Sequence, residues 1–310
     1  MLQETFSFTG SNGTKLPGIL WLPEGKILAV LQMTHGMTEH TGRYADFAQE
    51  LTNHGIAVAG FDLRGHGLNP GNPDVASFGE KGWDAAIEDM KCFYDLLDAR
   101  FPEIPHFLQG FSLGSFLLRE YLGRYFDGPA GAIILGTGYQ PPAILSVLQW
   151  IIRKEWKKAG FDNTSNLVKK LSFETYNQKF RPNRTDADWL CADEAQLDTY
   201  RKDPLVRRNI SGGLFWELLG SMKRTGSPFA YDHWETDIPV LLLSGEDDPV
   251  GDQGKGVRMV YHQMRKSGIE DVTLHLLPCA RHDVLHEVSS GATDQATEII
   301  QDWILQQISQ

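Results

Sequence analysis

A serine between two glycines lies where the sequence changes from a strand pattern to a helix pattern. The segment 110–114, Gly-Phe-Ser-Leu-Gly, follows the apolar run 106–109 and precedes a helix-like stretch, 116–122. Glycine at both flanking positions lets a strand and a helix approach closely in a tight turn, which leaves the hydroxyl of Ser112 exposed. The amide of Leu113, at the start of the expected helix, would point at an oxyanion formed there. The pattern predicts a nucleophilic serine with one oxyanion donor beside it.

An acid and a histidine follow this serine along the chain. A buried strand predicted over 238–244 runs into a Gly-Glu-Asp-Asp-Pro-Val loop, whose spacing selects Asp248 as the acid and leaves Asp247 as a solvated or capping neighbour. A second strand, 272–277, precedes the loop that carries His282. Serine, acid, histidine is the chain order of the α/β-hydrolase triad, whereas the chymotrypsin and subtilisin folds use other orders. We therefore expect a Ser-His-Asp triad.

His282 and His286 also imitate a zinc-binding His-Glu-x-x-His motif. Asp283 replaces the glutamate with a side chain one methylene shorter, and no third ligand is apparent in the sequence. We therefore predict no metal site, and nothing in the sequence calls for a cofactor.

A second oxyanion donor is expected from the loop after an earlier strand. The apolar run 27–33 is that strand, and it opens into the loop 34–40. The backbone N–H of Met37 in this loop would face the substrate carbonyl oxygen. His35 is interpreted as a residue that braces the loop, and the polar turn 62–67 after the next strand is also given a structural role.

The loops at the ends of these strands together resemble the monoacylglycerol lipase and lysophospholipase branch of the α/β-hydrolases, often grouped as serine aminopeptidase S33-like. The resemblance covers about residues 25–137 and 235–308, and it is specific because five motifs occur in the family's order. It implies the same three triad residues and the same two oxyanion donors. It departs from the branch at Phe111, where histidine is common. The motifs are residues 35–40, 61–67, 110–115, 244–250 and 280–282.

Alternating strand and helix patterns predict how these loops are brought together. A helical pattern over 81–100 lies between two strand patterns, which is typical of an α/β fold. In a mostly parallel, doubly wound sheet, functional loops gather at the carboxyl ends of the strands. After the strand at 130–135 this alternation stops. We expect an α/β-hydrolase core of residues 1–138 and 232–310, with an inserted helical cap of residues 139–231.

One segment of the expected cap, 147–158, is amphipathic. On a helix, Leu148, Ile151, Ile152 and Trp156 share one face, and four basic side chains lie mostly opposite. We expect Ile151, Ile152 and Trp156 to bind substrate over the acyl pocket. Two roles remain open for the basic side: a solvated outer surface of a lid, and peripheral contact with anionic lipid.

Charge and cysteine content limit the class of protein further. The chain carries a net charge of −11, although residues 139–231 hold 15 Lys and Arg against 10 Asp and Glu. Basic residues confined to one insert of an acidic chain do not indicate a nucleic-acid partner. Cys92, Cys191 and Cys279 form no CxxC pair and no even-numbered framework, which favours free thiols. With no signal-peptide pattern and no apolar run of about 20 residues, we expect a cytoplasmic protein.

These residues predict a serine carboxylester hydrolase acting on acyl esters of small-molecule size, monoacylglycerol- or lysophospholipid-like. The sequence of 139–231 does not match the family well enough to transfer a substrate, and the sequence does not indicate an oligomeric state. A peptidase of the iminopeptidase type is the enzymatic alternative, and it would need cap carboxylates such as Glu155, Glu174 or Glu217 to hold an ammonium group. A non-catalytic ligand receptor with this fold is the third hypothesis.

Overall fold

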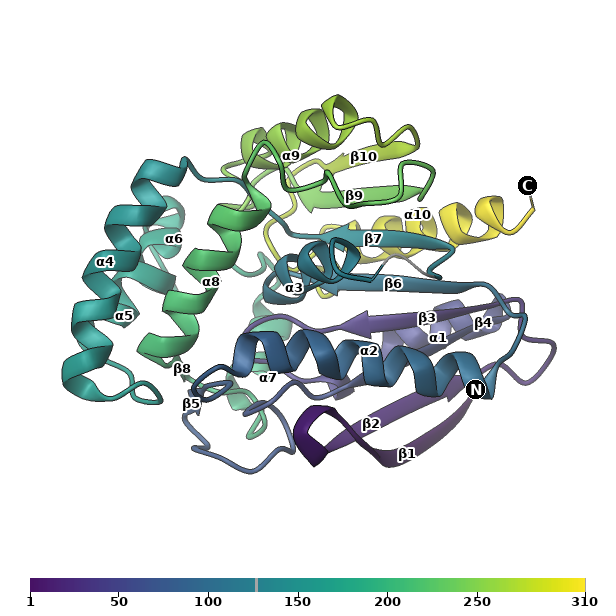
Figure 1. The fold of residues 1–310 in the computed structure, drawn as a ribbon, viewed down its shortest axis with the longest axis horizontal. Coiled ribbons are helices and arrows are strands. Elements are labelled where there is room, and N and C mark those ends of the chain that lie inside the picture. The colour runs from purple at the N-terminus through teal and green to yellow at the C-terminus, as the bar shows by residue number, and fades with distance from the viewer. Residues whose placement is uncertain (126–127, 310) are drawn as a thin grey trace.

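A sheet of eight strands forms the centre of the computed structural model, which describes residues 1–125 and 128–309. The strand order is β1-β2-β4-β3-β6-β7-β9-β10 (Figure 1). In this spatial order the six strands from β4 to β10 are parallel, whereas β1 and β2 form an antiparallel hairpin at one edge. The predicted α/β class with a mostly parallel sheet is confirmed. The strands are β1 (Leu2–Thr9), β2 (Lys15–Leu22), β3 (Ala29–Thr34), β4 (Ile56–Phe61), β6 (His106–Phe111), β7 (Gly131–Leu135), β9 (Val240–Gly245) and β10 (Val272–Leu277).

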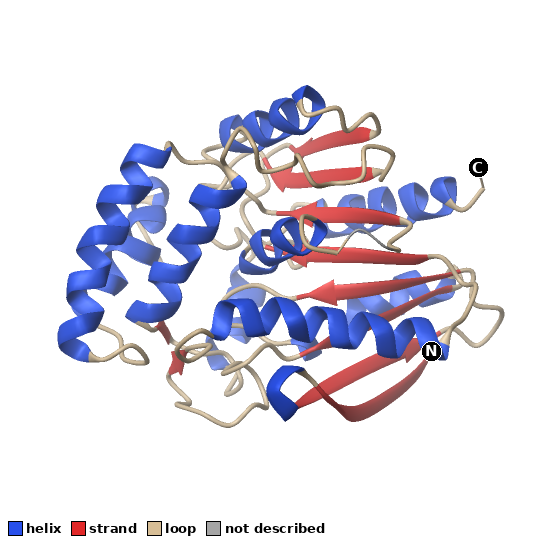
Figure 2. Ribbon diagram, viewed as in Figure 1, coloured by secondary structure: helices blue, strands red, loops and turns tan. Residues whose placement is uncertain are grey.

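Helices cover both faces of this sheet. Every residue of β3, β4, β6, β7 and β9 is buried, as expected for parallel strands with helices on either side. The helices α2, α3 and α9 lie on one face and α1 and α10 on the other (Figure 2). Their side chains belong to two separate hydrophobic clusters, one on each face. These helices are α1 (Ala45–Asn53), α2 (Gly82–Arg100), α3 (Leu113–Leu122), α9 (Lys255–Lys266) and α10 (Ala292–Gln307).

Between β7 and β9 the chain leaves the sheet and forms the helices α4 to α8, which we call the insertion. Figure 1 shows the insertion beyond the arrowheads of the parallel strands, so it lies at their carboxyl ends. A two-stranded parallel sheet joins it to the core, because β5 (Val75–Ala76) pairs with β8 (Asn209–Ile210). The predicted cap, 139–231, falls within the insertion. Its helices are α4 (Pro142–Ala159), α5 (Asn166–Lys169), α6 (Thr175–Asn177), α7 (Glu194–Lys202) and α8 (Gly212–Thr225).

Candidate active site

Ser112 occupies a strained turn between β6 and α3. Its backbone angles are φ 50° and ψ −114°, a region that a residue with a side chain rarely adopts. A Cβ at position 110 would come within 2.4 Å of the carbonyl oxygen of Gly114, and one at position 114 within 2.3 Å of the carbonyl oxygen of Thr34. Both flanking positions therefore require glycine, as the sequence pattern predicted.

The structure brings Ser112, His282 and Asp248 into one chain of hydrogen bonds. The Oγ of Ser112 lies 2.8 Å from Nε2 of His282, and Nδ1 of His282 lies 2.9 Å from Oδ2 of Asp248. Asp248 is fully buried and His282 is 1% exposed, whereas Asp247 is exposed. Of the two adjacent aspartates, only Asp248 contacts the histidine. This is the arrangement that orients an imidazole to accept a proton from a hydroxyl.

Two further hydrogen bonds fix the Asp248 carboxylate. The amide of Val250 donates to Oδ1 over 2.8 Å, and the hydroxyl of Ser244 donates to Oδ2 over 3.0 Å. Oδ2 therefore faces both His282 and Ser244, while Oδ1 faces the backbone. Because each oxygen has a defined partner, the carboxylate cannot rotate without breaking a buried hydrogen bond.

Two aromatic rings pack around His282. The ring of Phe111 has its centroid 4.9 Å from that of the imidazole, and the ring of Trp189 has its centroid at 5.1 Å. Phe111 belongs to the serine turn and occupies the position where histidine is common in the monoacylglycerol lipase and lysophospholipase branch. Trp189 comes from the insertion and was missed by sequence reasoning, because it lies outside any periodic segment that would indicate its partner.

The residues predicted as oxyanion donors are both near Ser112 in the structure. Leu113 is the first residue of α3, so its amide has no acceptor within that helix. Met37 follows β3 and lines the small cavity at Ser112. His35 braces the same loop, because its Nδ1 lies 2.7 Å from the carbonyl oxygen of Gly36 and its Nε2 accepts from the amide of Leu63 over 2.9 Å. Burial lowers the pKa of His35, as expected for a neutral structural ring.

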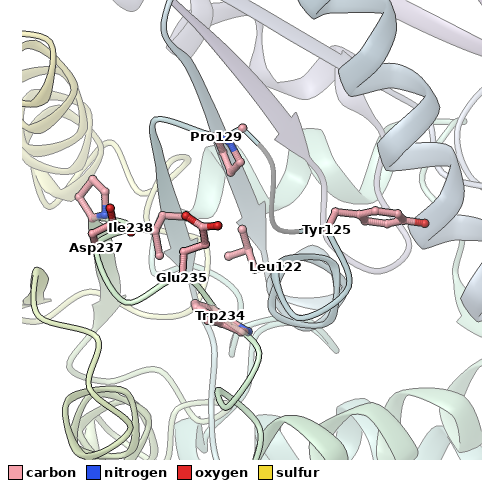
Figure 3. Close-up of a pocket in the computed structure, with 9 residues that line it drawn as sticks. Leu122, Tyr125, Pro129, Trp234, Glu235, Asp237 and Ile238 are labelled. Carbon is pink, nitrogen blue, oxygen red and sulfur yellow. The ribbon is translucent and has the colours of Figure 1, made fainter.

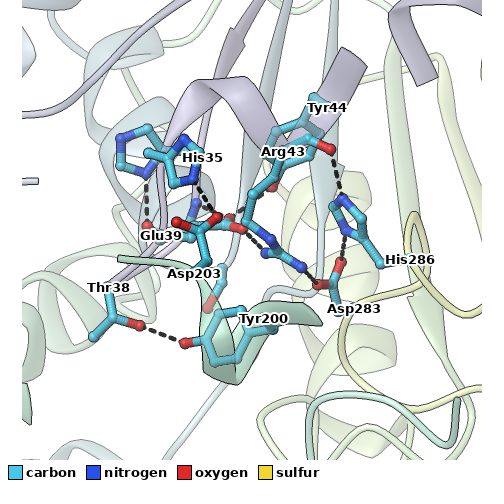
Figure 4. Close-up of polar contacts among 12 residues, drawn as sticks. His35, Thr38, Glu39, Arg43, Tyr44, Tyr200, Asp203, Asp283 and His286 are labelled. Atoms are coloured by element: carbon cyan, nitrogen blue, oxygen red, sulfur yellow. Dashed lines mark hydrogen bonds and ion pairs between the residues drawn. The ribbon is translucent and has the colours of Figure 1, made fainter. Parts of the chain in front are cut away.

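An ionic network joins the loop of Met37 to the loop of His282. Arg43 donates to Glu39 and, over 2.9 Å, to Asp283, whose other oxygen lies 2.8 Å from Nδ1 of His286 (Figure 4). Nε2 of His286 lies 3.0 Å from the carbonyl oxygen of Arg43. Burial alone would raise the pKa of Asp283, but His286 and Arg43 outweigh it and hold that pKa below the ordinary value. His286, the second histidine of the zinc-like motif, therefore belongs to a structural network.

The cavity at Ser112 is narrow and is walled by the insertion. Its volume is about 20 Å³, which is room for about one water molecule. Its apolar wall includes Phe173, Trp189 and Leu190 from the insertion and Phe111 from the core. A separate cavity lies at the amino ends of β7 and β9 and is lined among others by Trp234 (Figure 3). No residue of the triad lines it.

The cap residues predicted to bind substrate do not line the cavity at Ser112. Ile152 is fully buried in the hydrophobic core that α4 shares with α8. Trp156 contacts Trp216 of α8 and Phe161, with ring centroids at 6.1 and 5.2 Å. Ile151 is half-buried on the same helix. Ile152 and Trp156 therefore support the helix pair of the insertion in this conformation. Contact of the three residues with substrate stays a prediction.

A serine, a histidine and a buried acid at the carboxyl ends of a mostly parallel sheet define an α/β-hydrolase. The family described as serine aminopeptidase, S33, matches residues 25–289, and the chain belongs to that family. The predicted family resemblance and the assignment to the hydrolases are confirmed.

Similar proteins include lipases and esterases. Mouse monoglyceride lipase is 27% identical over 295 residues, which are 93% of this chain and 86% of the mouse protein. The solved structure of a highly thermostable carboxyl esterase from Bacillus coagulans, in complex with glycerol, has a TM-score of 0.90 at 24% identity and covers 99% of both chains. The chain also matches an abhydrolase domain-containing protein of Dictyostelium discoideum at 27% identity over 292 residues, but it spans only 27% of that protein's length.

Proposed function

We propose that the protein hydrolyses carboxylic esters of acyl chains through an acyl-enzyme formed on Ser112. The observation that carries this proposal is the continuous hydrogen-bond chain from Ser112 through His282 to Asp248. Names of similar proteins support it, since they include a monoglyceride lipase and a carboxyl esterase.

The proposed reaction has two steps. Oγ of Ser112 attacks the ester carbonyl carbon while Nε2 of His282 takes the hydroxyl proton, and Asp248 stabilises the imidazolium that forms. The amides of Met37 and Leu113 donate to the tetrahedral oxyanion. When the carbon–oxygen bond breaks, His282 protonates the leaving alcohol. Water then attacks the acyl-enzyme with His282 as base, which releases the acid and restores the serine.

Monoacylglycerol- or lysophospholipid-like esters are the proposed substrates, with residues 139–231 acting as a cap. Phe173, Trp189 and Leu190 give the cavity an apolar wall suited to an acyl chain. A cavity of about 20 Å³ cannot hold such a chain, because it holds about one water molecule. Substrate entry therefore requires these side chains to separate from the core.

A peptidase needs a free carboxylate near the serine to bind a substrate ammonium group. The carboxylates that line the cavity, Glu39 and Asp283, are both bound to Arg43. Glu217, one of the acids considered for this role, lines a different cavity beside α2. The described structure therefore favours ester over aminoacyl substrates.

Turnover of p-nitrophenyl esters of rising chain length, compared with aminoacyl p-nitroanilides, tests the proposal. We expect ester hydrolysis that increases with moderate chain length and disappears in Ser112→Ala. Faster hydrolysis of the anilides would establish the peptidase. Binding of esters without turnover, equal in wild type and Ser112→Ala, would establish a receptor.

We further propose that α4 contacts lipid surfaces. Ile144, Val147 and Trp150 are 51–59% exposed along one side of α4. The ammonium group of Lys154 lies 3.5 Å from the ring centroid of Trp150, and Lys157 and other exposed basic side chains follow on the same helix. Exposed apolar residues with adjacent cations suit the interface of an anionic membrane. In the described part of the chain, no helix is both long and apolar enough to cross a bilayer.

The expected cytoplasmic location also remains a proposal. Cys92, Cys191 and Cys279 are free thiols in the structure, which suits a reducing compartment.

A further inference from the structure

A second cavity adjoins the one at Ser112 and is lined by three arginines; we call it the outer compartment. Its volume is about 120 Å³, and it shares Trp189, Leu190 and Tyr200 with the inner cavity. The remaining wall includes Arg201, Arg207 and Arg208 but only one acid, Asp186. These side chains therefore give the outer compartment an excess of positive charge.

Two of these arginines have no carboxylate partner among the residues that the structure describes. Arg201 is paired with Asp186, with Nε 3.0 Å from Oδ1. Arg207 is only 6% exposed, and its guanidinium donates to backbone carbonyls, among them that of Gly67 over 2.9 Å. Arg208 is exposed and donates to the carbonyl of Asp203 over 3.2 Å. None of the ion pairs found among residues 1–125 and 128–309 includes Arg207 or Arg208.

Asp203, the acid nearest to Arg207 and Arg208 in the sequence, already has other hydrogen-bond partners. The carboxylate of Asp203 accepts from Nε2 of His40 over 2.8 Å and from the amide of Leu205 over 2.8 Å. It therefore cannot turn toward Arg208 without breaking both contacts. Arg207 is a buried cation without a counter-charge, which is unfavourable, and an anionic ligand would relieve that cost.

We infer that the outer compartment binds a phosphate group carried by the alcohol part of the ester, while the ester carbonyl lies at Ser112. The inference rests on the proposed function and selects the lysophospholipid-like class over neutral monoacylglycerols. Guanidinium groups match phosphate oxygens in charge and in planar geometry. The hydroxyl of Tyr200 lies 2.8 Å from Oγ1 of Thr38, which belongs to the Met37 loop, and both residues line both cavities (Figure 4). A head group beyond these two residues lies close to the reacting carbonyl.

Binding to Ser112→Ala enzyme tests this inference without requiring turnover. The probes are 1-octanoylglycerol and 1-octanoylglycerol 3-phosphate, measured by calorimetry below their micelle concentrations. Adding Arg201→Gln and Arg208→Gln removes two cations but spares Arg207, which ties the loop of Gly67 to the insertion. We expect the phosphate probe to bind more tightly, and we expect the double change to reduce this preference about tenfold, since one exposed charge contributes up to about fivefold.

Lys202→Gln is the matched control, because Lys202 is exposed on the same helix as Arg201, carries the same charge and lines neither cavity. It should retain the preference for phosphate. Equal binding of the two probes, or a preference that survives the double change, overturns the inference. Tighter binding of octanoyl lactate, which carries a carboxylate on the alcohol side, overturns the choice of phosphate.

Turnover of both probes by the otherwise wild-type enzyme separates the two proposals. One outcome is that the phosphate probe binds more tightly, that the double change removes this preference, and that neither probe is hydrolysed. This outcome supports the binding site and refutes the proposed ester hydrolysis. Hydrolysis of both probes with equal KM, unaltered by the double change, refutes the binding site and leaves the ester hydrolase intact. The expected result is a lower KM for the phosphate probe that rises in the double variant.

Discussion

Replacing Asp248 by asparagine tests the acid of the triad, because the structure determines how the amide must sit. Oδ1 of Asp248 accepts from the amide of Val250, so the oxygen of asparagine stays there. The new NH₂ group then faces Nδ1 of His282 and the hydroxyl of Ser244, where Oδ2 was. His282 must accept at Nδ1 and carry its proton on Nε2, which leaves no lone pair for the proton of Ser112.

The expected loss in kcat is about 10⁴-fold, the size found when a triad aspartate becomes asparagine in a serine protease. This corresponds to about 5 kcal/mol of transition-state stabilisation. Rotating the amide does not rescue activity, because its NH₂ group would then oppose the N–H of Val250, and a neutral amide cannot stabilise an imidazolium. KM should change little, because Asp248 does not line the cavity at Ser112.

Initial rates with p-nitrophenyl butyrate measure this effect, and thermal unfolding of each variant checks that the fold is kept. Asp247→Asn is the matched control, because it makes the same chemical change at an exposed neighbour. It should stay within about twofold of wild type, as expected for an exposed side chain. The assignment is wrong if Asp247→Asn is the severe variant, or if Asp248→Asn retains activity within about tenfold of wild type.

Three further predictions concern other residues. Ser112→Ala and His282→Ala should each reduce kcat by about 10⁶-fold, and the double variant little more, because the triad acts as one unit; additive losses in single-turnover assays would contradict this. Burial and Asp84 raise the pKa of Glu217 to about 7 from 4.5, so the folded state favours the proton and stability falls as pH rises between these values. Glu217→Gln should therefore raise the unfolding temperature at pH 8 but not at pH 4, and an equal rise at both would disprove the shift. Trp150→Ser should weaken co-sedimentation with vesicles of anionic lipid without altering hydrolysis of short soluble esters; unchanged sedimentation would remove the lipid-contact proposal.

The serine turn and the acid were predictable because their constraints are local. The glycines at 110 and 114 are required by backbone atoms of adjacent elements, and such close approaches leave a pattern in the sequence. The strands around them are buried on both faces and therefore read as short apolar runs. Loop spacing selects Asp248 over Asp247, and in the structure Asp248 is the aspartate that lies within hydrogen-bond distance of His282.

The contacts of the insertion, including those that wall the cavity at Ser112, were not predictable in the same way. Helix α4 carries apolar residues around much of its circumference, since Ile152 is buried while Val147 and Trp150 are exposed. A pattern of this kind indicates a helix but does not say which side meets which partner. Trp189 lies in an irregular segment, and its contact with His282 depends on how the insertion folds back over the sheet. Such contacts between distant segments leave no periodic signal.

The ionic network around Arg43 shows how such tertiary contacts serve the chemistry. Glu39 belongs to the loop of one expected oxyanion donor, and Asp283 directly follows the histidine of the triad. Because Arg43 binds both carboxylates in a buried site, it holds the donor loop and the base loop at a fixed separation. Removing the guanidinium would take away the cation that two buried carboxylates share, which costs more than the loss of a surface ion pair. The alignment of the expected oxyanion donor with the proposed general base therefore depends on residues whose types, taken singly in the sequence, indicate no function.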